Sequence, residues 1–198
     1  MVISAEPYGI PPGAIQKGAS SLLDAGDDRM QQVQFIGGHL WGALDTGVTI
    51  PNDTAPRAGI TWFKVLPILE GQRIAVAAIS GQGYVATQGN YLLYPAIQAN
   101  RDGAAAMVFT LCGPTVFPSA AYTVMAPEMG FRPITIAAAG TGPYDPTATR
   151  WGDYSAAVLD PGGTSFWFAT EYIPPPASQT TDGLRNWGAR VLNVAPGS

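Results

Sequence analysis

Three segments of this 198-residue chain repeat one pattern at a spacing of about sixty residues, and this repeat limits the possible folds more than any other feature. The copies begin at Met30, Tyr94 and Tyr154, which are 64 and 60 residues apart. Each copy has a run of six or seven residues, a turn that contains glycine, and a second run of similar length, which is the pattern of a β-hairpin. Because a repeated segment usually encodes a repeated structural module, the hairpin predicts the architecture of the whole chain.

Further extended segments follow each hairpin. A third strand is expected at 59–66, 118–124 and 186–192, and a fourth follows the first two copies at 73–79 and 133–138. The 24 glycines and 18 prolines exceed average usage and indicate many turns between short strands. The alanine-rich runs are too short, between glycines and prolines, to be read as helices.

These patterns predict an all-β fold, a β-propeller built of four-stranded antiparallel blades with three blade equivalents per chain. Residues 1–198 form a single repeat domain, with blade equivalents at about 26–86, 87–144 and 145–195, and residues 1–8 are expected to form a fourth strand that completes another blade. Natural propellers typically have about 4–8 blades. Three blades are therefore interpreted either as half of a six-bladed ring, which a second copy completes, or as a fragment of a larger propeller.

The composition excludes several classes of function. Charged residues make up only 12% of the chain, the net charge is −4, and the two lysines are Lys17 and Lys64, so neither nucleic acid nor an anionic membrane is an expected partner. With one cysteine and one histidine, we expect no disulfide, no metal site and no cofactor. No apolar run approaches the roughly 20 residues of a membrane helix.

The same composition favours an exported protein. Low lysine content together with many glycines and aromatic residues is common in exported bacterial β-proteins, so we expect an extracellular or periplasmic location. No charged segment followed by an apolar one opens the sequence, so a secretory signal is not expected within it.

The longer, polar loops of such blades emerge on one face, and function is expected there. Asp153 begins an innermost strand, and Glu171 ends the neighbouring strand at the same level. Two carboxylates at such a rim suit general acid and base or nucleophile roles in glycoside cleavage. Alternatively, Asp153 caps backbone amides and a nearby arginine pairs with a carboxylate of the next blade. The candidate binding residues around the pair are Asp28, Arg29, Arg150, Trp151, Tyr154 and Tyr172.

Other residues are expected to be structural. Asp102 and Asp160 lie in the hairpin turns, His39 follows a turn, and Cys112 ends a strand as a half-buried thiol. Four tryptophans recur at matching strand positions and predict packing between blades: Trp41, Trp62, Trp167 and Trp187.

Two stretches carry a resemblance to a known family. The segments that begin Tyr94-Pro95-Ala96-Ile97 and Arg150-Trp151-Gly152-Asp153 resemble bacterial propeller proteins of the broad sialidase-like superfamily, over about residues 26–192. The resemblance implies a fold that binds or hydrolyses glycans, often without catalysis. The superfamily's aspartate box, Ser-x-Asp-x-Gly-x-Thr-Trp, is matched here only at Asp160, Gly162 and Thr164. Val158 and Ser165 stand in place of its serine and tryptophan, so catalytic roles do not transfer.

The sequence thus favours an extracellular propeller module that binds glycan or protein through its loop-rich face, and a homodimer that completes a six-bladed ring. One alternative is a glycoside hydrolase that uses Asp153 and Glu171. Another is a purely structural fragment of a larger propeller.

Overall fold

The computed structural model describes residues 2–53, 55–126, 130–144, 150–175 and 186–196, and all regular elements in these ranges are β-strands. The strands are β1 (Val33–Ile36), β2 (His39–Val48), β3 (Arg57–Glu70), β4 (Arg73–Val85), β5 (Tyr91–Ala99), β6 (Ala105–Gly113), β7 (Val116–Ala126), β8 (Gly130–Phe131), β9 (Thr135–Ala138), β10 (Ala156–Leu159), β11 (Phe166–Tyr172) and β12 (Gly188–Val194). Among these residues, no helix has the length and apolar character that crossing a bilayer requires.

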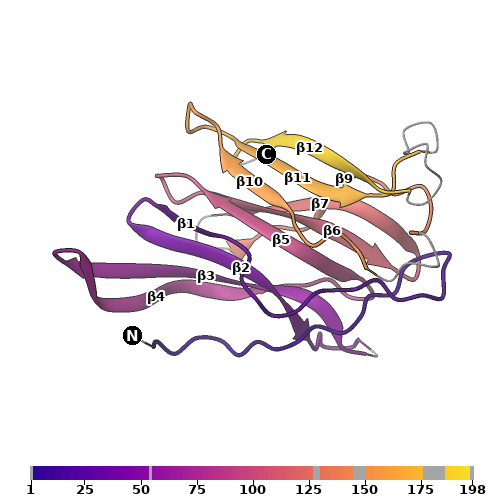
Figure 1. The fold of residues 1–198 in the computed structure, drawn as a ribbon, viewed down its shortest axis with the longest axis horizontal. Coiled ribbons are helices and arrows are strands. Elements are labelled where there is room, and N and C mark those ends of the chain that lie inside the picture. Colours follow the sequence, from indigo (N-terminus) through magenta and orange to yellow (C-terminus); the bar gives the residue numbers. More distant parts are fainter. Residues whose placement is uncertain (1, 54, 127–129, 145–149, 176–185, 197–198) are drawn as a thin grey trace.

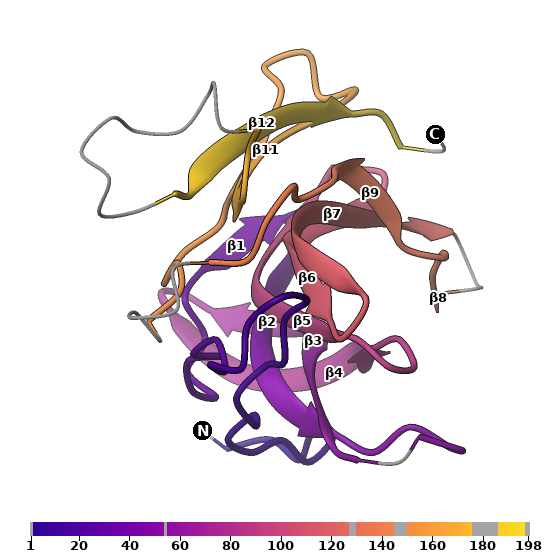
Figure 2. The same cartoon turned by 90° about the vertical axis from the view of Figure 1, so that its right-hand side faces the viewer.

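The strands form three antiparallel sheets that stack as layers (Figures 1 and 2). The first sheet has the order β1-β2-β3-β4, the second β5-β6-β7 with β8 and β9 both paired to β7, and the third β10-β11-β12. The all-β fold, the three hairpins and the third strands are therefore confirmed. The described strands form no closed ring, so assembly into a propeller stays a prediction.

The hairpin turns have the predicted chemistry, with one difference. Gly37 and Gly38 adopt φ angles of 58° and 78°, which residues with a Cβ rarely reach. In the third hairpin, Asp160 Oδ2 accepts a hydrogen bond from the Gly162 amide at 2.8 Å, as expected of a turn aspartate. In the second, the side chain that accepts from the turn amides is Asn100, not Asp102.

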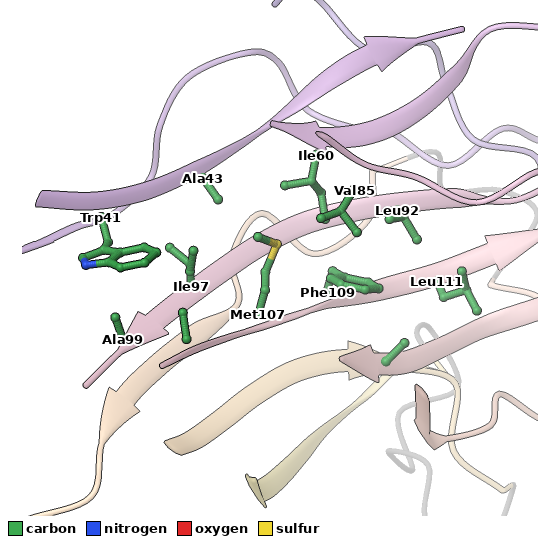
Figure 3. Close-up of a cluster of buried hydrophobic side chains, with 12 residues drawn as sticks. Trp41, Ala43, Ile60, Val85, Leu92, Ile97, Ala99, Met107, Phe109 and Leu111 are labelled. Atoms are coloured by element: carbon green, nitrogen blue, oxygen red, sulfur yellow. The ribbon is translucent and has the colours of Figure 1, made fainter. Parts of the chain in front are cut away.

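The second sheet is covered on both faces. Every residue of β5 and β6 is buried, which explains why their sequences lack polar alternation. Figure 3 shows the core between the first and second sheets, where Trp41 and Ile60 meet Met107 and Phe109. A separate cluster, which includes Val108 and Phe168, joins the second sheet to the third.

Only some of the four tryptophans pack between sheets, as predicted for packing between blades. Trp41 and Trp62 stack at 6.3 Å between their ring centroids and pack in the core between two sheets. Trp167 is 45% exposed, because alternation along β11 places it on the outer face of the third sheet. Its predicted packing is therefore not formed within the chain.

Residues 2–8 do not form a strand in the described chain. They run along the first sheet, where the Glu6 amide donates to Gln82 Oε1 at 3.0 Å, and Gly9 exchanges hydrogen bonds with Thr46. Their expected role as a strand in another blade concerns a second copy and stays a prediction. Beyond them, Ala14 and Leu23 form an isolated antiparallel bridge.

A third core cluster lies at the strand ends away from the three predicted hairpin turns, near the start of β5 and the ends of β6 and β11. It contains Leu23, Tyr94, Cys112, Trp151 and Ile173. Cys112 is fully buried rather than half-buried, and burial raises the pKa of its thiol well above the ordinary value. This cluster supports the candidate functional site.

Candidate functional site

A cavity of about 250 Å³ lies at the loop-rich end of the third sheet. The segment before β10, the end of β11 and the start of β12 together supply its lining, which is Tyr144, Arg150, Gly152, Asp153, Tyr154, Glu171 and Trp187. Three of the chain's aromatic rings and two carboxylates therefore share one pocket. Such a combination of apolar surface and a few polar groups is typical of small-molecule sites.

Trp151 anchors the segment that carries Asp153. Its side chain is 1% exposed and lies edge-on to Tyr144, with ring centroids 5.0 Å apart. The indole Nε1 donates to Thr110 Oγ1 at 3.3 Å, and that hydroxyl donates to the backbone carbonyl of Glu171 at 2.8 Å. Thr110, on the central strand β6, thus fixes both sides of the pocket at once.

Gly152 allows the two sides to approach closely. It adopts a φ of 32°, and a Cβ at this position would lie 3.1 Å from Glu171 Oε2. The Gly152 amide also hydrogen-bonds the Glu171 carboxylate. A side chain at position 152 would therefore push the carboxylate away from this amide.

The two carboxylates of the pocket have different environments. Burial raises the pKa of Glu171, the nearby Asp153 raises it further, and the Gly152 amide opposes both effects. Asp153 pairs with Arg150, and the guanidinium is 78% exposed. The ion pair raises the pKa of Arg150. One carboxylate is thus neutralised by a cation, whereas the other has no ion-pair partner in the described part of the chain.

The structure brings together only part of the predicted site. Asp153, Glu171, Arg150 and Tyr154 line one pocket. The prediction that Asp153 begins a strand is wrong, because β10 begins only at Ala156 and Asp153 lies in the segment before it. Trp151, a predicted binding residue, does not line the pocket, because its ring is buried in the core beneath the loops.

Three further predicted binding residues lie outside the pocket lining. Arg29 pairs with Asp27 at 2.7 Å, and its electrostatic interaction with Tyr154 places it nearby without lining the cavity. Asp28 and Tyr172 are half-buried and do not line it either.

Sequence reasoning missed Tyr144 and Trp187. Tyr144 follows Gly142-Pro143 in a loop. Trp187 was predicted to pack between blades; it packs against the core beneath the loops and also lines the pocket. The signal that was available is their position, since each lies in or beside one of the longer loops on the predicted loop-rich face.

Two unusual residues lie deeper in the same end of the fold. Tyr94 adopts a φ of 53°, in the left-handed region that bulky residues rarely occupy. Its amide donates to both carboxylate oxygens of Asp45, at 3.0 Å each. Its hydroxyl is buried without a hydrogen-bond partner among the described residues, and it interacts electrostatically with Asp153 and Arg150 of the pocket.

Asp45 makes folding sensitive to pH. Burial raises its pKa well above the ordinary 3.8, Asp27 adds to this effect, and the Tyr94 amide opposes it. A raised pKa means that the folded state binds the proton more tightly, so this contribution to stability is complete below about pH 4 and decreases as pH rises through the folded-state pKa. We expect Asp45→Asn to flatten this decrease, measured by chemical denaturation across pH 4–8. Asp102→Asn, in an exposed turn, is the control, and equal slopes in both variants would contradict the assignment.

Thr110 can be tested by an isosteric change. Thr110→Val leaves the Trp151 indole N–H and the Glu171 carbonyl without this partner inside the protein, which should lower the free energy of unfolding by about 1–3 kcal/mol. Thr135→Val, at an exposed strand position, should change it much less. Denaturant titration of both variants measures the difference, and equal effects would show that Thr110 is not an anchor.

The described residues contain no group of three or more His, Cys, Asp or Glu side chains arranged to hold a metal ion. Comparisons with protein-family models, with curated protein sequences and with solved structures find no match to the chain. The candidate site is therefore defined by its geometry, which brings an ion-paired aspartate and an unpaired, half-buried glutamate into one aromatic pocket.

Proposed function

We propose that the chain is an extracellular or periplasmic module that binds a carbohydrate in the pocket between Asp153, Glu171 and Trp187. The observation that carries the proposal is the lining itself, where aromatic rings stand beside carboxylates and an arginine. Aromatic faces pack against the C–H surfaces of sugars. Carboxylates accept hydrogen bonds from sugar hydroxyl groups, and a guanidinium donates to them. Tyr154, which is 70% exposed, offers the most accessible ring.

The test is titration calorimetry against a panel of oligosaccharides. A sugar that binds should bind at least about tenfold more weakly to Trp187→Ala and to Glu171→Gln, since each change removes a lining group worth about 1.4 kcal/mol or more. Glu70→Gln, in the exposed turn between β3 and β4, is the matched control and should bind normally. Absence of binding across the panel would contradict the proposal, and so would binding that neither pocket variant weakens.

A second candidate is glycoside hydrolysis by the same pocket. The observation that favours it is the difference between Glu171, whose burial raises its pKa, and Asp153, which is paired with Arg150. Two carboxyl groups in different environments are what an acid and its nucleophile or base require. Release of reducing ends that both Glu171→Gln and Asp153→Asn abolish would establish hydrolysis. Binding without release would leave the binding module as the function.

For assembly, we propose that a second copy completes a six-bladed ring. The outer face of the third sheet exposes Val158, Trp167 and Val191, at 56%, 45% and 60%, and strand β1 exposes Val33 and Phe35, at 55% and 62%. Within the chain, neighbouring sheets already bury apolar faces of this kind against each other, which supports the same packing between copies.

Light scattering tests this assembly. A dimer at micromolar concentration that Trp167→Asp converts to a monomer would support it, because the charge would have to be buried in the contact. A stable monomer of the unaltered chain at that concentration would contradict it, and so would a larger oligomer.

A further inference from the structure

The charges around the pocket restrict the ligand that it can accept. Among the described arginines, Arg150 lines the pocket and Arg29 interacts with Tyr154, and each is already paired, Arg150 with Asp153 and Arg29 with Asp27. Glu171 has no cation beside it in the described chain, and Asp24 uses one oxygen to accept the Gly26 amide at 2.9 Å. Among the residues that line the cavity, the two carboxylates therefore exceed the one guanidinium, and an anionic ligand would be repelled.

The aromatic lining fits a cation as well as a sugar face. Tyr144, Tyr154 and Trp187 surround the cavity, and a ligand cation over such a ring is attracted by the ring quadrupole. The Arg57 guanidinium makes this type of contact elsewhere in the chain, 4.9 Å from the centre of the Tyr91 ring. Rings and carboxylates together favour an ammonium group over a second carboxylate.

We propose that the pocket selects a ligand that carries an ammonium group, namely an amino sugar with a free amine. The ammonium lies between the Glu171 carboxylate and the aromatic rings of the lining. This inference rests on the proposed carbohydrate function and adds the charge of the sugar to it. An N-acetylated sugar keeps the same ring but has lost the charge, so it is the matched control ligand.

Calorimetry at neutral pH and low ionic strength tests the inference. The probes are glucosamine oligosaccharides, their N-acetylated counterparts and an acidic oligosaccharide, with methylammonium as a simple cation. The amino sugar should bind about tenfold or more tightly than the N-acetylated one, and added salt should reduce this preference. Glu171→Gln should abolish the preference, because it removes the negative charge that faces the ammonium. Glu70→Gln should leave it unchanged, and thermal unfolding checks that each variant is folded.

The outcomes separate the two proposals. If neutral or acidic sugars bind as tightly as the amino sugar, the inference is wrong and the carbohydrate function stands. If no sugar binds but methylammonium does, and Glu171→Gln abolishes this binding, the ammonium site is supported and the carbohydrate function is wrong. If neither sugars nor methylammonium bind, both are wrong.

Discussion

Replacement of Asp53 by alanine should lower the free energy of unfolding by about 3–5 kcal/mol, the cost of leaving one charge of a buried ion pair without its partner. Asp53 Oδ2 accepts from Arg57 Nε at 2.9 Å and Oδ1 from Nη2 at 2.5 Å, and the two side chains are only 4% and 8% exposed. The Gly89 amide also donates to Asp53, at 2.9 Å, so the carboxylate joins the loop before β5 to the start of β3.

The matched control for Asp53 is Asp27→Ala, which removes an exposed ion pair. Arg29 is 84% exposed, and water solvates it when Asp27 is absent, so the unfolding midpoint should hardly change. Guanidinium denaturation of both variants measures the difference. If Asp53→Ala cost no more than Asp27→Ala, the Arg57–Asp53 pair would have no special role in stability.

Replacement of Phe109 by alanine should also cost about 3–5 kcal/mol, because it removes a large ring from the core between the first and second sheets. Phe109 is 0% exposed, at the middle of β6, and it packs with Met107 and Ile60 in Figure 3. Neighbouring strands on both sides prevent the core from collapsing into the space that the ring leaves, so most of the cavity should persist.

Phe35→Ala makes the same chemical change at a site that is 62% exposed, and it should alter the unfolding free energy only slightly. Denaturation at low protein concentration compares the two variants. A loss at Phe109 no larger than that at Phe35 would mean that the core is plastic at this position.

The predictable part of the fold is the part that local chemistry determines. Gly37 and Gly38 mark the first turn because few other residues adopt their φ angles, and the runs on either side of each predicted turn form strands. The third strands follow from the same repeat. Closure into a ring depends on contacts between chains, which the residues of one chain do not determine locally.

The candidate site was predictable in position but not in detail. Asp153 was expected to begin a strand, but β10 begins only at Ala156, and Asp153 lies in the segment before it that lines the pocket with Glu171. Trp151 misled the prediction because a tryptophan in a polar loop suggests an exposed ring, whereas Thr110 and Tyr144, distant in sequence, hold it in the core. The left-handed backbone of Tyr94 depends on Asp45, 49 residues away, and no local pattern indicates it.

The burial of β5 and β6 on both faces has a consequence for the dynamics of the molecule. Amide protons of these strands can exchange with solvent only when neighbouring layers separate, so their protection should approach the free energy of global unfolding. The third sheet, whose outer face is open, can detach with less loss of contact. Because Glu171 ends a strand of that sheet, occupancy of the pocket should slow amide exchange selectively in β10–β12. Hydrogen exchange can therefore detect binding in a mixture of compounds before the compound that binds has been identified.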